Sequence, residues 1–284
     1  MVRSLASLVG VERPFDRQSR LVTSPFLSPI ALACLRLLMG LSLFVALLAS
    51  LIQRGVHDHQ AGRFFSYFTF LTGIGLTAYL FQAGWLGVAF VLRLRKGLPG
   101  SHPLQNWPIV LQALHLILLA SVRTLPIIVS IVFWTFLAKG GSLKSALGRY
   151  LNISVHALNS VFALFEVFAT HTPRSAWFNT IIMVVILGLY VCVAYITHAA
   201  QGFYTYSFLD PANGAGKLAM YLVLIPVAEA IIFAIINGLV WLRMRFVPEP
   251  RIFVLQEPTD PPSPEKDDEE SLGKPQATES RLHL

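Results

Sequence analysis

Thr69 and His156 are the side chains of this sequence whose types and positions could do chemistry together. Thr69 lies in the stretch FFSYFTFLTGIG, just inside a long apolar run, and His156 lies inside another apolar run, YLNISVHALNSVFALFEVF. A threonine hydroxyl becomes a nucleophile when a base removes its proton, and imidazole is the common base near neutral pH. Near a membrane surface, such a pair would suit an ester whose chains lie in lipid. The alternative for Thr69, and our prediction for Thr72, is a hydroxyl bonded to a carbonyl of its own helix.

The elements that carry these residues are membrane spans. The chain has 284 residues, of which 55% are hydrophobic and only 13% are charged. Crossing a bilayer takes about 20 apolar residues, and each span must satisfy its own backbone polar groups as a helix. The sequence therefore predicts an all-α, polytopic membrane bundle of about six transmembrane helices. We place the spans near residues 30–52, 67–92, 110–138, 150–170, 176–199 and 216–242.

Charge divides the chain into three parts. The formal net charge is +7, but residues 247–284 hold nine acids and four bases. Because this segment is also Pro-rich and lacks apolar periodicity, we predict a disordered acidic tail over 246–284, after an N-terminal segment over 1–29 and a transmembrane domain over 30–245.

Eleven Lys and Arg residues flank the spans on one side and six on the other. This asymmetry predicts that both termini are cytosolic, and we do not expect nucleic acid as a partner.

The fourth span carries a stripe of polar residues. At helical spacing, Asn152, His156, Asn159 and Glu166 fall on one face. For Asn159 and Glu166 we favour a role in holding the bundle together by hydrogen bonds between helices.

Charged residues inside the membrane should be paired, neutral or directed into a cavity. Glu166 and Glu229 are the two acids within predicted spans, and Arg123 lies in the long third run. We interpret all three as structural intramembrane charges. Arg123 is a possible partner for Glu166. The two residues lie at similar depths if the third span starts near residue 117, and the pairing fails if the span starts nearer 108.

Depth brings three reactive residues into one layer. Thr69 lies at the start of the second span, His156 lies about 9 Å inside the fourth span at 1.5 Å per residue, and His198 lies in the last turn of the fifth. Cys34 and Cys192 lie in separate spans and are expected to behave as small apolar groups. We infer no metal site and no cofactor.

Three segments of the chain resemble the FAR-17a/androgen-induced protein (AIG1-like) family of multi-pass membrane proteins. They are YFTFLT, NISVHALNSVFALFE and THAAQGFYTYSFLD, and the resemblance runs over most of residues 30–242 in span order. Animal members of this family hydrolyse fatty acid esters of hydroxy fatty acids with a threonine nucleophile. Two positions depart from the family pattern, because Ile153 replaces the first histidine of an Asn-His-x-x-His motif and Ser207 stands where a proline is usual.

The resemblance implies an intramembrane lipid ester hydrolase with Thr69 as the nucleophile and His156 as the general base. The partners it implies are a lipid ester substrate and membrane lipids, and lipid chemistry suggests the endoplasmic reticulum or another endomembrane. The alternative is a non-catalytic multi-pass protein, a small transporter or scaffold, whose polar stripe only packs helices. Candidate substrate-binding or orienting side chains are Tyr67, Asn152, Asn159, His198 and Tyr206.

Overall fold

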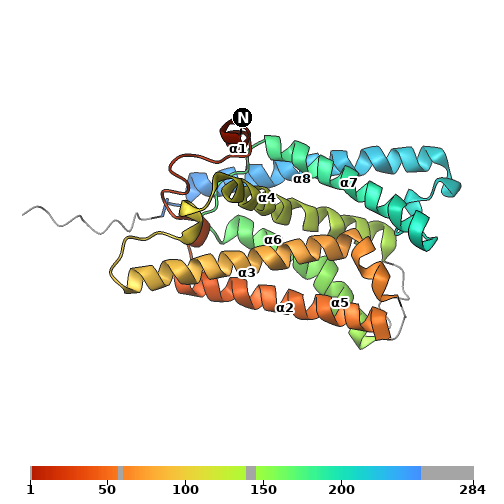
Figure 1. Ribbon diagram of the computed structural model, residues 1–284, viewed down its shortest axis with the longest axis horizontal. Helices are drawn as coiled ribbons and strands as arrows, with labels where there is room; N and C mark the ends of the chain where they lie inside the picture. The colour runs from red at the N-terminus through yellow and green to blue at the C-terminus, as the bar shows by residue number, and fades with distance from the viewer. Residues whose placement is uncertain (1, 57–59, 139–144, 251–284) are drawn as a thin grey trace, which may run out of the picture.

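The structure, a computed structural model, describes residues 2–56, 60–138 and 145–250, and its regular secondary structure is helical. Within these residues there is no β-strand, and six helical segments are long and apolar enough to cross a membrane, which confirms the predicted all-α bundle (Figure 1). The spans are α2 (Pro29–Val56), α3 (Phe68–Arg95), α4 with the π-helical turn η4 (Ile109–Val132 and Phe133–Leu137), the broken span α5, η5 and α6 (Ala146–Ile153, Ser154–Leu158 and Asn159–Phe168), α7 (Phe178–Gln201) and α8 (Ala215–Phe246).

Short helical turns lie outside the spans: α1 (Val2–Leu8), η1 (Arg20–Val22), η2 (Ala61–Ser66), η3 (Pro103–Asn106), η6 (Ser207–Leu209) and η7 (Pro211–Asn213). Most of the predicted disordered tail, residues 251–284, lies outside the described residues. Its first residues do make contacts, since Glu249 forms an ion pair with Arg20 and accepts a hydrogen bond from Gln18 at 2.8 Å.

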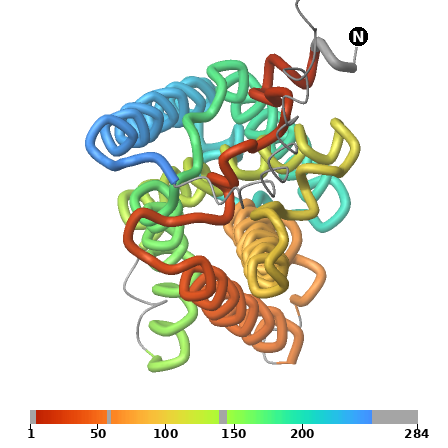
Figure 2. The backbone as a smooth tube through the Cα atoms, turned by 90° about the vertical axis from the view of Figure 1, so that its left-hand side faces the viewer, coloured from red at the N-terminus to blue at the C-terminus, as the bar shows by residue number. Residues whose placement is uncertain are grey.

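The N-terminal segment and the end of α8 lie at the same end of the bundle, as an even number of spans requires (Figure 1). Seen from that end, the N-terminal segment crosses over the helix ends (Figure 2). Hydrogen bonds hold the N-terminal segment against the bundle: the Asp16 carboxylate lies 2.8 Å from Nε2 of His102, and Arg36 donates to the Leu21 carbonyl at 2.8 Å. The assignment of this end to the cytosol stays a prediction.

Small residues bring α2 and α3 close together. A Cβ added at Gly87 would lie 2.9 Å from Cβ of Ala33, and one added at Gly84 would lie 2.7 Å from Cγ of Leu37. Without side chains at these glycines the two helices approach closely, as is common where membrane helices pack. This contact fixes the position of α3, whose first turn carries Thr69.

The expected pair between Glu166 and Arg123 is wrong. The α4 helix begins at Ile109, the case in which the pairing was expected to fail, and the Arg123 guanidinium makes its hydrogen bonds to other residues. Arg36 of α2 takes its place with two charge-assisted hydrogen bonds of 2.8 and 2.7 Å to the Glu166 carboxylate. Tyr79 of α3 donates a third, at 3.0 Å, so the carboxylate holds three spans together.

Arg123 instead contacts the connection between α6 and α7. It donates hydrogen bonds to the Pro173 carbonyl and to the Thr172 hydroxyl. Its charge therefore has a structural role, as expected, but with partners at the end of the bundle.

Candidate active site

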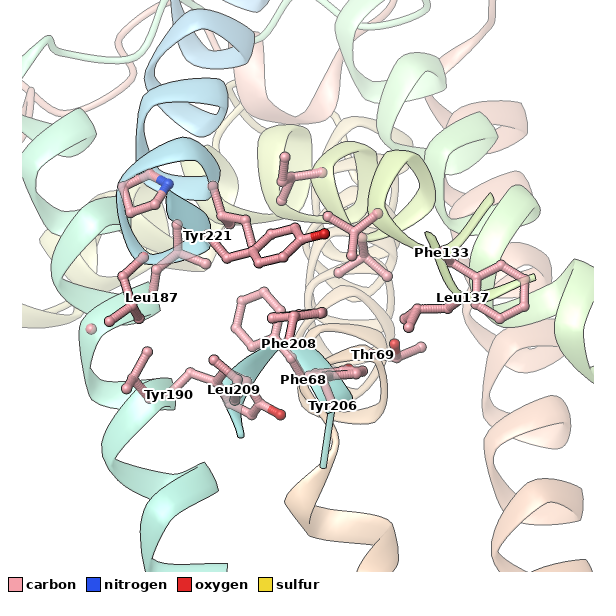
Figure 3. A pocket seen from close by; sticks show the side chains of 18 of the residues that line it. Phe68, Thr69, Phe133, Leu137, Leu187, Tyr190, Tyr206, Phe208, Leu209 and Tyr221 are labelled. Atoms are coloured by element: carbon pink, nitrogen blue, oxygen red, sulfur yellow. The ribbon is translucent and has the colours of Figure 1, made fainter. Parts of the chain in front are cut away.

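A cavity of about 390 Å³ opens between α3, α4, α7 and α8, near the end of the bundle opposite the N-terminal segment. Its walls are mostly apolar, and the residues with hydroxyl groups that line it are Thr69, Tyr190, Tyr206 and Tyr221 (Figure 3). Lipid-binding sites commonly combine apolar walls with a few polar groups of this kind. The cavity is therefore the site at which the chemistry of Thr69 has to be judged.

The hydroxyls of Thr69 and Thr72 have different surroundings. Thr72 donates to the carbonyls of Phe68 and Thr69, both at 3.0 Å, and so it is bonded to its own helix as predicted. For the Thr69 hydroxyl, no such bond to α3 is found in the described part of the chain, and Thr69 is 6% exposed on the cavity wall. Thr69 thus has a hydroxyl available to a molecule in the cavity.

His156 lies behind this wall. Its ring is buried and stacks on Phe133 with centroids 3.5 Å apart and planes 2° apart, and Phe133 lines the cavity on the same side as Thr69 (Figure 3). Both stacked rings come from π-helical turns, η5 and η4, a rare geometry that is frequent at functional sites. No hydrogen bond joins Thr69 to His156 among the described residues. Such bonds between a nucleophile and its base often tighten only with substrate bound.

Tyr206 is the aromatic residue most closely associated with Thr69. It lines the same cavity, and its ring packs against those of Tyr67 at 6.0 Å and Phe208 at 5.2 Å. Burial raises the pKa of the Tyr206 phenol above its ordinary value, and hydrogen bonding with Thr69 acts in the opposite direction. The phenol therefore keeps its proton and can donate a hydrogen bond beside Thr69.

The sequence comparison decides the family. A sequence model of the FAR-17a/AIG1-like protein family matches residues 32–240, which is most of the chain and includes the four middle spans and most of the first and last. The chain belongs to the FAR-17a/AIG1-like protein family. No curated protein and no solved structure gave a match.

The remaining predicted site residues of this FAR-17a/AIG1-like protein lie away from the cavity. The Asn152 amide donates to the Gly148 carbonyl at 2.8 Å, and that of Asn159 donates to the Val155 carbonyl at 2.7 Å, so both bond to their own span. His198 stacks on Tyr204 with centroids 3.9 Å apart and lines a separate hollow near Asp210. The depth estimate put His198 at the correct end of the bundle, but it could not show that the ring faces another hollow.

A hydroxyl network that sequence reasoning missed positions the first turn of α3. The Tyr190 hydroxyl donates to the Ser66 carbonyl at 3.1 Å and lies 3.0 Å from the Thr205 hydroxyl, from which it can accept, and Thr197 donates to the Ser66 hydroxyl at 3.0 Å. The network joins α7 to the segment before Thr69 and to the loop before Tyr206. Its only signal in the sequence was a tyrosine within an apolar span, which by itself is equally typical of packing.

Proposed function

We propose that this FAR-17a/AIG1-like membrane protein is an intramembrane lipid ester hydrolase in which Thr69 is the nucleophile. The observation that carries the proposal is that the Thr69 hydroxyl faces an apolar cavity instead of bonding to its own helix. The family resemblance supports the same role for Thr69.

The reaction has two steps. In the first, Oγ of Thr69 attacks the ester carbonyl carbon while its proton passes to His156, and the alcohol leaves with that proton when the tetrahedral intermediate collapses. In the second, His156 takes a proton from water, the hydroxide attacks the acyl-threonine, and the fatty acid leaves as Thr69 regains its proton. His156 must approach Thr69 for both transfers, and its position in a π-helical turn next to the cavity wall supports this role.

Tyr206 is our candidate for stabilising the negative charge on the carbonyl oxygen. Its phenol lies on the cavity wall beside Thr69 and retains its proton. Removing one such donor from an acyl-transfer site costs about 10²–10³ in kcat. Tyr206→Phe should therefore lower kcat over that range, with little change in KM.

Fluorophosphonate labelling tests the proposal directly. An activated Thr69 should react with a fluorophosphonate probe, and Thr69→Ala should abolish the labelling. Thr72→Ala is the matched control because it removes a hydroxyl one turn away that is bonded to its own helix, and it should leave labelling intact. If wild-type protein stays unlabelled, the non-catalytic alternative, a transporter or scaffold, becomes the better account.

For the orientation, we propose that both termini are cytosolic, so that Thr69 lies near the opposite face of an endomembrane. The asymmetry of Lys and Arg around the spans supports this orientation.

A further inference from the structure

Glu229 is a buried carboxylate that the proposed reaction does not use. It lies in the middle of α8, is 0% exposed, and neither carboxylate oxygen has a hydrogen-bond partner of acceptable geometry among the described residues. Thr124 of α4 lies next to it, and the Thr124 hydroxyl donates to the Ala120 carbonyl of its own helix at 3.3 Å. None of the ion pairs in the described part of the chain includes Glu229.

A third polar group lies at the same depth on α7. Trp177, the residue before α7, contacts Phe233 of α8, with ring centroids 6.0 Å apart, which sets the register of these antiparallel helices. Thr180 lies about one turn after Trp177 on α7, and Glu229 lies about one turn before Phe233 on α8. Because the helices are antiparallel, both steps run in the same direction. The Thr180 hydroxyl is buried and, like the Glu229 carboxylate, has no partner in the described residues.

These three groups form a polar layer directly below the cavity. Glu229 follows the wall residue Ile225 by one helical turn on α8. Thr124 precedes the wall residue Ile128 by one turn on α4, and Thr180 precedes Val184 by one turn on α7. The polar layer, defined as Thr124, Thr180 and Glu229, therefore lies at the inner end of the cavity, on the same helix faces that line it.

Two groups of this layer, the Thr180 hydroxyl and the Glu229 carboxylate, are unsatisfied, and this is costly at such a depth. A buried polar group without a partner costs about 1–3 kcal/mol, and ionisable residues within membrane spans are expected to mark functional sites. Burial between membrane-spanning helices without a cationic partner favours the uncharged carboxylic acid, which can both donate and accept. The Thr180 hydroxyl and this carboxylic acid, with the Thr124 hydroxyl able to accept a further bond, suit a small uncharged group with the same double capacity.

We propose that the polar layer binds a hydroxyl group carried far along the chain of a lipid whose ester lies at Thr69. Eight residues of α8 separate Tyr221, on the cavity wall, from Glu229, or about 12 Å along the helix. A charged group would be strongly disfavoured at this depth. The inference deepens the proposed hydrolase function by naming the substrate as an ester with a hydroxylated chain, but its test does not depend on hydrolysis.

Binding of two matched amides tests the proposal. The amides replace the ester and have the same chain length, one with a plain chain and one whose chain ends in a hydroxyl. Purified full-length protein in detergent should bind the hydroxylated amide with a Kd about fivefold to tenfold lower, as expected for one net hydrogen bond. Thr180→Val, which keeps the side-chain shape, should abolish this preference, whereas Glu229→Gln should retain much of it.

Ser121→Ala is the matched control, because the Ser121 hydroxyl bonds to the Leu118 carbonyl of its own helix and lies outside the polar layer. It should leave the preference unchanged. Equal affinity for the two amides, no binding of either, or a preference that survives Thr180→Val would overturn the inference. A preference found without any ester hydrolysis would leave the inference standing and contradict the proposed function instead.

Discussion

At the scale of single residues, two threonines one turn apart on α3 differ in what their hydroxyls contact. Thr72 uses its hydroxyl on its own helix, and Thr69 presents one to the cavity. Sequence order and depth suggested this difference, because Thr69 starts the span while Thr72 has a full turn of carbonyls before it. The stacking of His156 on Phe133 could not be predicted, since it depends on two π-helical turns that shift the helical register.

Thr69 and His156 should act as one unit in hydrolysis. His156→Ala should abolish ester hydrolysis, and Thr69→Ala combined with His156→Ala should be little worse than either single variant, because nucleophile and base serve the same step. Thr69→Ser should keep partial activity, since serine keeps the hydroxyl but lacks the methyl group that restricts its rotamer. Steady-state kinetics on purified variants measure these effects. Multiplicative losses in the double variant would show that the two residues act separately.

At the scale of helices, the ion pair between Arg36 and Glu166 ties α2 to α6, with Tyr79 adding α3. The polar stripe of the fourth span correctly indicated that Glu166 faces the bundle interior. Its partner could not be predicted, because the choice between two buried arginines depends on how the side chains of separate spans pack around the carboxylate. The sequence analysis did not name Arg36, although a lone arginine inside the first apolar run was a signal that could have pointed to it.

Removing one partner of this ion pair should destabilise the protein more than replacing both partners with apolar residues. Glu166→Leu leaves a buried guanidinium without its counter-charge, and we expect a loss of about 3–5 kcal/mol in the free energy of unfolding. Arg36→Leu combined with Glu166→Leu should lose clearly less. Thermal unfolding in detergent measures both, and a double variant less stable than Glu166→Leu would contradict this account.

The α7 helix offers a way to fill the cavity without touching the reacting groups. Gly188 lines the cavity, and a Cβ added there would meet no atom within 4 Å. Gly188→Leu should therefore leave the fold intact, lower hydrolysis of long-chain esters and spare that of short-chain esters. The kcat/KM values for the two classes of ester measure the effect. An equal loss for both would mean that the cavity does not hold the chain.

At the scale of the whole molecule, the six spans and their order followed from the apolar runs, because a bilayer requires a minimum length of apolar helix. The N-terminal segment was expected only to lie outside the membrane. Its packing across the helix ends, with Asp16 beside His102, depends on contacts between residues far apart in sequence and was beyond prediction.

The orientation can be tested through the tail. Because the Lys and Arg asymmetry predicts a cytosolic C-terminus, protease added to sealed vesicles with the cytosolic face outward should remove residues 251–284. A tail that stays intact until detergent is added would reverse the topology. Deleting residues 255–284 should leave folding and hydrolysis nearly unchanged, since an acidic Pro-rich segment buries little apolar surface.

The central claim is that the Thr69 hydroxyl is the nucleophile, and hydrolysis by the purified Thr69→Ala variant tests it most directly. The rate of hydrolysis of a long-chain lipid ester should be compared between wild type, Thr69→Ala and Thr72→Ala, each shown to be monodisperse in detergent. We predict that Thr69→Ala has no activity above background and that Thr72→Ala stays near the wild-type rate. Hydrolysis by Thr69→Ala at the wild-type rate would contradict the account.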